Sequence, residues 1–278
     1  MPIVTQTNVA SLETQKNLFR SQAALQKSFS RLSSGHRINS AADDAAGLAI
    51  SESMRTQIRS YVVAERNASD AISMTQTAEG ALGEMHSILG RLRELAMQGS
   101  NGSMTATDRG YLSTEFSALQ AEMTRIQASS KFNGKSLLSA TASSLTFQVG
   151  LNNTASDKVT LTFGGLGLTT LLAATTNLSG AGTTASLTAL GRIDSALATI
   201  SPSRARSGAA TNRFAAVTSS IQTMRLNLSA ANSRIRDVDV AEETSALARN
   251  QVLSQAGVAV LAQANQLPQL ALSLVGGG

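Results

Sequence analysis

The chain has 278 residues, enough for one or two domains, and a formal net charge of +5 on a charged fraction of 15%. It contains no cysteine, which excludes disulfides, thiolate metal sites and cysteine nucleophiles. Tryptophan is absent and aromatic residues make up 3%, so a thick globular core is not expected. Nucleic-acid binding is not expected either, because no run of Lys or Arg is interleaved with aromatic residues.

Residues 3 to 33 are predicted to form the first helix, because apolar residues recur at spacings of seven and four. This stripe comprises Leu18, Leu25, Phe29 and Leu32. Ser33 and Ser34 then interrupt the pattern, and Gly35 suits the left-handed position past a helix C-terminus.

A second helix is predicted from about residue 41 to residue 98. Ser40 and Asp43 fit a capping box at its start. By spacing alone this is an ordinary helix-loop-helix corner, but a helix of this length would span roughly 85 Å at about 1.5 Å per residue, which is typical of long rods. The later part carries the apolar stripe Leu82, Met85, Leu89, Leu92 and Ala96.

Residues 99 to 107 have the composition of a turn, and Thr107 or Asp108 is predicted to cap a third helix. Its heptad stripe comprises Leu112, Phe116, Leu119, Met123 and Ile126. Alternating polar and apolar residues at 144–149 and 158–163 predict a β-hairpin with a somewhat long loop. The uncharged segment 164–184, rich in Gly, Thr, Leu and Ala, is predicted to be a loop excursion.

A further helical pattern begins at about residue 185, and Pro202 is expected to kink or restart it. The pattern then continues to residue 235, and residues 236–239 form a polar interruption. A last helix is predicted from about residue 241. Its stripe comprises Leu253, Val260, Leu267, Leu270 and Leu274.

The two end helices have no local partner, so the economical arrangement pairs them with each other. The hinge at residues 33–45 would then lie beside the interruption at 236–239. The predicted fold is mainly α, a long antiparallel helical rod with a terminal coiled-coil pair and a small β-hairpin. The predicted domains are residues 1–45 with 236–278, and residues 46–235, which include the hairpin at 144–163.

No catalytic or metal-binding pattern is present. His36 and His86, the only histidines, form no triad, zinc site or HExxH motif. The glycines at 164–167 lack the lysine–serine pair of a phosphate-binding loop. Asp43 and Asp44 fit the first turn of a helix better than acid–base chemistry. The chain is therefore predicted not to be an enzyme and to hold no cofactor or metal.

No secretory signal is visible in the first 12 residues, and no window of about 18 apolar residues predicts a membrane span. A membrane-active amphipathic helix is a competing interpretation, but it needs a basic polar face and aromatic anchors, which the end helices largely lack. Apolar stripes without a partner instead favour ordering when many copies pack together, and head-to-tail contacts that do not close form helical filaments.

The segment RLSSGHRINSAADDAAG resembles the N-terminal signature of bacterial flagellins. Further matches follow in the family's order: GALGEMHSILGRLRELAMQ, KFNGKSLL, ANSRIRDVDVAEETS and VLAQANQLPQLALSLV. The resemblance implies a terminal coiled-coil domain, a spoke, and a helical domain that carries a β-hairpin, in a short form without outer variable domains.

The resemblance also implies a function: self-assembly into the flagellar filament for swimming motility. It implies type III export without a cleaved signal peptide, and contact with an export chaperone and with the filament cap and hook-junction proteins. The expected inner-tube residues are Leu18, Leu25, Phe29, Leu32, Leu253, Val260, Leu267, Leu270 and Leu274. A hook-filament junction protein, which shares the terminal motifs, is the alternative.

The segment LGRLRELAMQ further resembles the part of flagellins that the vertebrate Toll-like receptor for flagellin contacts. Arg91 and Leu95 match the family's arginine and leucine, and Glu115 matches its acidic partner, whereas Gly90 replaces a common glutamine. Because Arg91 and Leu95 are four residues apart, they are predicted to share one exposed helix face. The competing interpretation, which the resemblance also implies, is that Leu95 is a packing residue inside the filament.

Overall fold

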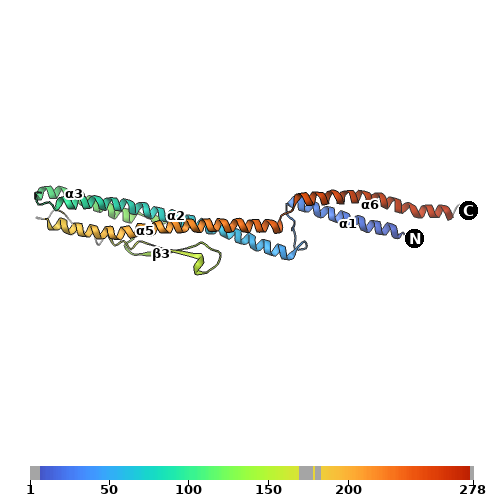
Figure 1. The fold of residues 1–278 in the computed structure, drawn as a ribbon, viewed down its shortest axis with the longest axis horizontal. Helices are drawn as coiled ribbons and strands as arrows, with labels where there is room; N and C mark the ends of the chain where they lie inside the picture. The colour runs from blue at the N-terminus through green and yellow to red at the C-terminus, as the bar shows by residue number, and fades with distance from the viewer. Residues whose placement is uncertain (1–6, 169–177, 179–182, 276–278) are drawn as a thin grey trace. The chain divides into compact units, whose positions relative to one another are not determined.

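The structure, a computed structural model, describes residues 7–168, 178 and 183–275, and for residues 267–275 the description covers the backbone only. Its long helices are α1 (Val9–Ser34), α2 (Ala45–Gly99), α3 (Ala106–Ser129), α5 (Thr184–Arg236) and α6 (Val240–Val275) (Figure 1). Two short strand pairs lie between α3 and α5: β1 (Lys131–Phe132) with β2 (Lys135–Ser136), and β3 (Ser143–Gln148) with β4 (Lys158–Phe163). A mainly α fold with a small β-hairpin is therefore confirmed.

The chain divides into two compact units. The terminal unit comprises Met1–Thr56 with Asn227–Gly278, and the central unit comprises Gln57–Leu226. The boundaries fall inside α2 and α5, whereas the predicted domain boundaries at 45 and 236 lie nearer the chain ends and stay a prediction. Within the described residues, no helix is sufficiently long and apolar to cross a membrane.

In the terminal unit, α1 and α6 pack as an antiparallel pair. At one end of the pair the Asn8 side-chain amide donates to the carbonyl of Ala264 at 2.7 Å, and at the other Arg31 pairs with Glu243 at 3.3 Å. Asn8 also caps α1 by accepting from the amide of Ser11. Gly35 ends α1 in the left-handed conformation, with φ of 71°, as its sequence position predicts.

The hinge between α1 and α2 differs from the predicted capping box. The Asp43 carboxylate accepts from the amide of Ser40 at 3.3 Å, but the Ser40 hydroxyl donates to that same carboxylate instead of accepting from a helix amide. Asp44 is the actual cap, because its Oδ1 accepts from the amide of Gly47 at 2.8 Å. The second helix therefore begins at Ala45 and not at residue 41.

The predicted proximity of the hinge and the polar interruption is confirmed. The amide of Arg37 donates to the carbonyl of Arg236 at 2.6 Å, and the amide of Val238 donates to the carbonyl of Gly35 at 3.1 Å. These bonds form a short antiparallel bridge between His36 and Asp237.

In the central unit, α3 is capped by Thr105, and the predicted caps Thr107 and Asp108 are wrong. The Thr105 hydroxyl accepts from the Asp108 amide at 3.3 Å, and the Asp108 carboxylate accepts from the Thr105 amide at 3.0 Å. These reciprocal bonds make a complete capping box. Arg109, which is buried, closes the end of α2 by donating to the carbonyl of Gly99 at 3.0 Å.

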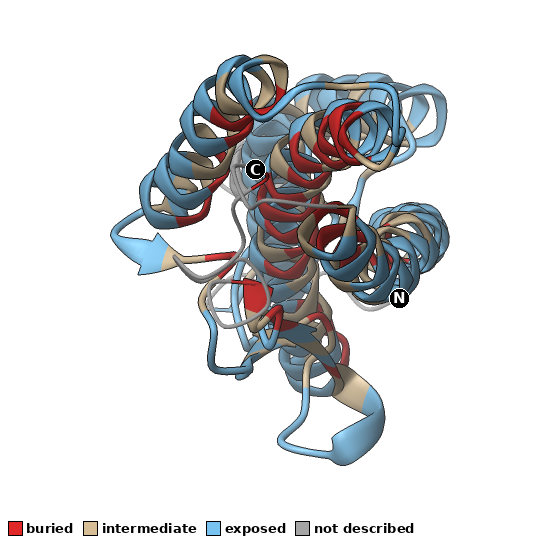
Figure 2. Cartoon of the chain, turned by 90° about the vertical axis from the view of Figure 1, so that its left-hand side faces the viewer, coloured by how far each residue is buried: buried red, intermediate tan, exposed pale blue. Residues whose placement is uncertain are grey.

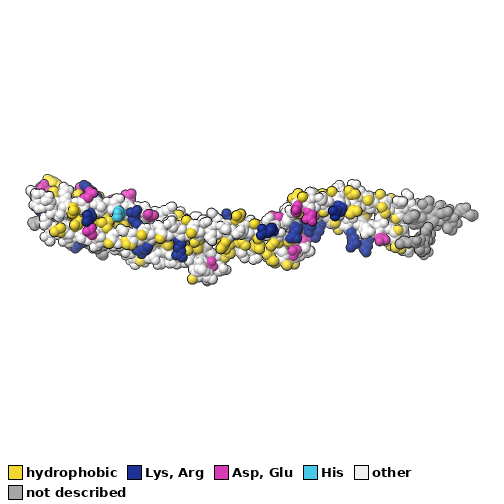
Figure 3. Space-filling model, viewed as in Figure 1, with side chains coloured by type: hydrophobic (Ala, Val, Ile, Leu, Met, Phe, Trp, Pro, Cys, Tyr) yellow, Lys and Arg dark blue, Asp and Glu magenta, His cyan; other side chains and the backbone are white. Residues whose placement is uncertain are grey.

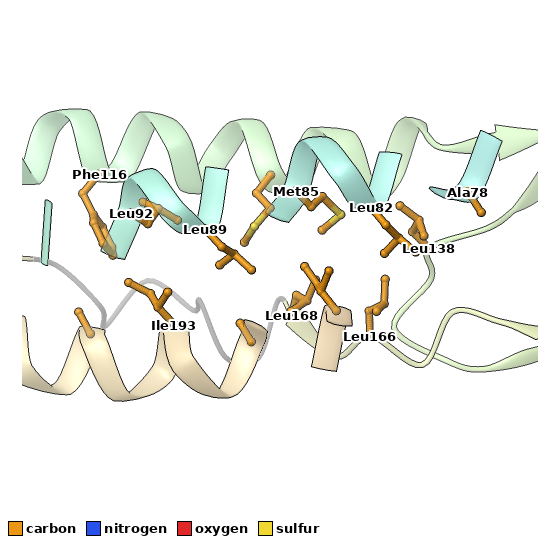
Figure 4. Close-up of a cluster of buried hydrophobic side chains, with 14 of the residues drawn as sticks. Ala78, Leu82, Met85, Leu89, Leu92, Phe116, Leu138, Leu166, Leu168 and Ile193 are labelled. Atoms are coloured by element: carbon orange, nitrogen blue, oxygen red, sulfur yellow. The ribbon is translucent and has the colours of Figure 1, made fainter. Parts of the chain in front are cut away.

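The core of the central unit follows the predicted stripes. Leu82, Met85, Leu89, Leu92 and Ala96 of α2 are all at most 2% exposed. They pack against Phe116 of α3 and Ile193 of α5, as Figure 4 shows for most of them. Buried residues gather where helices face one another (Figure 2). The seven-residue rhythm thus predicted this core.

The predicted hairpin is confirmed as β3–β4, paired in antiparallel register from Ser143 opposite Phe163 to Gln148 opposite Lys158. The ring of Phe147 meets that of Phe214 on α5 edge-on, with centroids 5.6 Å apart. β1 and β2 are joined by Asn133 and Gly134, both with positive φ, as a tight hairpin turn requires. The loop predicted at 164–184 lies mostly outside the described residues.

α5 runs through Pro202 without a break, so the expected interruption does not divide it. Buried neighbours explain this tolerance: Ala196 and Ile200 on one side and Ser207 on the other hold the helix against the core. Tertiary packing here outweighs the poor helix propensity of proline.

Candidate self-assembly surface

The seam between α1 and α6 buries very little apolar surface. Among residues 9–34 and 240–266, the buried residues are Ser11, Ser28 and Ala264. The Ser11 hydroxyl donates to the Asn265 side chain across the seam at 2.8 Å. The pair is therefore held largely by polar contacts and half-buried leucines.

Large apolar side chains of both helices face outward instead, and Figure 3 shows hydrophobic side chains on the visible face of this unit. Each is more than half exposed. They are Val9, Leu12, Phe19, Phe29, Val240, Val252, Leu253, Val258 and Val260. Nine large exposed apolar side chains on two helices that pack against each other mark a candidate interaction site.

The predicted assembly residues fall into three groups. Leu18, Leu25 and Leu32 are half-buried in the seam, and a Cβ built on Gly257 would lie 3.3 Å from Leu18 Cδ1. Phe29, Leu253 and Val260 are 51–55% exposed and face outward. The side chains of Leu267, Leu270 and Leu274 lie outside the described part.

Sequence reasoning missed other outward residues, among them Phe19 at 69% and Val258 at 54% exposure. They do not follow the seven-residue spacing from which the stripes were identified. An apolar residue on an otherwise polar face of a helix was the signal that could have found them.

Ion pairs fix the hinge of the terminal unit. Lys27 pairs with Asp43 at 2.7 Å, and Arg236 pairs with Glu52 at 2.6 Å. The hydrogen bond from Lys27, together with the amides of Asn39 and Ser40, lowers the pKa of Asp43 to about 2. These ion pairs stabilise the hinge, whereas the seam between α1 and α6 buries little apolar surface.

The predicted receptor-contact residues do not share one exposed patch. The Arg91 guanidinium donates to Glu115 at 2.8 Å and to Glu94 at 2.9 Å, and these carboxylates raise its pKa. Arg91 and Glu115 are about half exposed, but Leu95 is 1% exposed. The expected exposure of Leu95 is wrong, because Leu95 lies three residues after buried Leu92 and therefore on the core side of α2. Receptor contact itself stays a prediction.

No group of three or more His, Asp or Glu residues is placed to hold a metal ion among the described residues. His36 Nδ1 lies 3.3 Å from the Asp237 carboxylate in the hinge bridge. His86 is partly buried on α2, and Nδ1 of His86 has no hydrogen-bond partner there.

Two regions of this chain match one protein family, and its relatives in that family align over nearly the whole chain. Residues 5–143 match the bacterial flagellin N-terminal helical region, and residues 190–275 match the bacterial flagellin C-terminal helical region. Flagellin of Halalkalibacterium halodurans is 42% identical over 96% of this chain and 98% of its own length. Flagellin of Bacillus subtilis is 41% identical over the same shares.

A third relative is the flagellar filament core protein flaB2 of Brachyspira hyodysenteriae, which is 40% identical over 98% of this chain and 100% of its own length. None of these three names indicates a hook-filament junction protein. The two matched regions together span more than half of the sequence. This chain belongs to the bacterial flagellin family.

Proposed function

We propose that the outward apolar faces of α1 and α6 are the surfaces by which this chain polymerises. As a flagellin, the chain is a structural subunit of the bacterial flagellar filament. The observation that carries the proposal is the exposure of nine large apolar side chains on two helices whose own seam buries no large one in the described part.

The energetics favour assembly over isolation for this surface. Full burial of a Val, Leu or Phe side chain contributes about 1.5–3 kcal/mol, whereas ordering each backbone residue costs about 1–2 kcal/mol. In the single subunit that cost is poorly offset, since Phe29, Leu253 and Val260 remain half exposed. Packing against other copies supplies the missing burial, and contacts that do not close extend as a helical filament.

A charge on this surface tests the proposal. Val260→Asp is expected to abolish polymerisation, because an unpaired carboxylate would be buried between subunits, whereas Val260→Ala is expected only to weaken it. Electron microscopy after addition of a precipitating salt or filament seeds reads the outcome. Ser156→Asp, an equal charge on an exposed loop of the hairpin, is the matched control.

Circular dichroism of the monomers separates assembly from folding. Residue 260 is 52% exposed in the single subunit, so the Asp variant is expected to keep its helix content. Normal filaments from Val260→Asp would contradict the proposed surface. Short rings from the unaltered chain would instead indicate a hook-filament junction protein.

We further propose that the chain is exported through the flagellar type III channel without loss of a signal peptide, assisted by an export chaperone, and assembles between hook-junction and cap proteins. The family membership supports this route. Intact-mass measurement of filament protein sheared from cells is expected to match the full-length translation product of the gene, allowing for loss of the initiator methionine. A mass that lacks a longer N-terminal segment would contradict it.

Recognition by the vertebrate Toll-like receptor for flagellin is proposed for the Arg91–Glu115 pair, which is exposed and joined at 2.8 Å. Arg91→Ala is expected to reduce signalling in reporter cells given monomeric protein. Arg125→Ala, which breaks a comparable exposed pair with Glu122 on α3, is the control. Equal signalling from the unaltered protein, Arg91→Ala and Arg125→Ala would contradict the proposal. Loss of signalling in Leu95→Ala, without loss in Arg91→Ala, would instead reflect damage to the core of the central unit.

A further inference from the structure

A cavity of about 350 Å³ lies in the central unit among α2, β4 and α5. Its lining is largely apolar and includes Leu82, Leu137, Leu138, Phe163, Leu166 and Ala210, each at most 7% exposed. Hydroxyl side chains also line it, namely Thr75, Thr160, Thr162, Ser203 and Ser207. Figure 4 shows Leu82 of α2 beside Leu138, with Leu166 facing them from below. The core residues that line the cavity leave this volume unfilled, and none of the lining residues belongs to the assembly surface of α1 and α6.

Two arginines of α5, Arg206 and Arg213, also line the cavity. They are seven residues apart, so they lie on one helix face about 10.5 Å apart along the axis. Both side chains are exposed. The described residues that line the cavity include no Asp or Glu.

Among the described residues, neither guanidinium group has a carboxylate partner, unlike several other arginines of the unit. Arg91, Arg93 and Arg225 each pair with a carboxylate at 2.9 Å or less. Arg206 donates only to its own helix, to the carbonyl of Pro202 at 3.4 Å and the hydroxyl of Ser203 at 3.2 Å. Arg213 makes no hydrogen bond or ion pair with any described residue.

An apolar cavity with unpaired guanidinium groups at its edge has a definite ligand chemistry. A guanidinium binds a carboxylate with two parallel hydrogen bonds, and the leucine-lined interior accommodates a hydrocarbon chain. The volume lies at the lower end of the range for small-molecule sites, about 300–1,000 Å³. We infer that this cavity binds a single-chain anionic amphiphile, a medium-chain fatty acid, with its carboxylate on Arg206 or Arg213.

Dodecanoate added to the full-length monomer tests the inference. Displacement of a dansyl-labelled fatty acid is a suitable measurement, because the chain contains no tryptophan to interfere. Saturable binding of one molecule per chain is expected. The double variant Arg206→Gln/Arg213→Gln is expected to weaken binding by about tenfold or more, while Arg59→Gln, an exposed arginine of α2 outside the cavity, leaves it unchanged.

Two further comparisons locate the site. Ala210→Leu fills the cavity and is expected to abolish binding, with unchanged circular dichroism as the check on folding. Dodecanol, which has the same chain without the charge, is expected to bind at least tenfold more weakly. Equal binding of the alcohol, no effect of the arginine pair, or loss of binding in Val260→Asp, which would place the ligand on the terminal helices, would each overturn the inference.

Discussion

The two units of this chain use apolar residues in opposite ways. In the central unit, Leu89 and Phe116 are fully buried within their own subunit. In the terminal unit, Phe29 and Val260 are more than half exposed. The same heptad rhythm therefore serves folding in one region and, as proposed, assembly in the other, and a stripe alone does not reveal which partner covers it.

The largest expected effect comes from a pair of phenylalanines that sharpens this contrast. Phe116→Ala is expected to lower the free energy of unfolding by about 3–5 kcal/mol, because it opens a cavity in the core. Phe29→Ala is expected to change monomer stability by about 0.5 kcal/mol at most but to impair polymerisation. Denaturant unfolding of both monomers measures the difference. Equal destabilisation would show that the terminal unit has a core of its own.

A smaller effect is expected at the start of α3. Thr105→Ala removes the cap and is expected to cost about 1 kcal/mol of central-unit stability. Thr107→Ala, the same substitution at the second residue of the helix, is the control and is expected to cost little. Thermal unfolding of the two variants compares them. A larger loss of thermal stability in Thr107→Ala than in Thr105→Ala would instead support Thr107 as the cap of α3.

The smallest effect concerns the hinge and its pH dependence. The folded pKa of Asp43, about 2, lies below its ordinary value of 3.8, so the Lys27–Asp43 pair stabilises the hinge above about pH 4 and this contribution is lost as pH falls through about 2. Carboxyl NMR is expected to show a midpoint near 2, and Lys27→Ala to raise it. Lys16→Ala, a change at an exposed lysine of α1, is the control and is expected to leave the Asp43 midpoint unchanged. An unchanged midpoint in Lys27→Ala would show that Lys27 does not lower the pKa of Asp43.

Local spacing predicted much of the fold because helix periodicity and strand alternation are properties of neighbouring residues. The stripe from Leu82 to Ala96 and the β3–β4 hairpin follow from such patterns. The proximity of the hinge to residues 236–239 followed instead from pairing the two end helices, which lack a local partner. Helix starts were less certain because Ser40, Asp43 and Asp44 are each plausible caps by type. Only the geometry of the hinge selects Asp44.

The candidate surfaces were predicted less well, because exposure depends on residues far away in sequence. Leu95 has the spacing of an exposed partner for Arg91, yet the core of the central unit covers it. Pro202 should disrupt a helix in isolation, yet α5 continues through it beside buried Ile200. Phe19 was missed because it lies outside the stripe of Leu18, Leu25 and Leu32, and its only sequence signal is an apolar residue on an otherwise polar helix face.

Hydrogen exchange of α1 and α6, compared between monomer and polymer, tests the central claim most directly. If these helices complete their burial only against other copies, their amides exchange quickly in the monomer and slow by orders of magnitude in the filament, while the buried part of α2 is already protected in the monomer. Strong protection of α1 and α6 in the monomer, unchanged on polymerisation, would contradict the account.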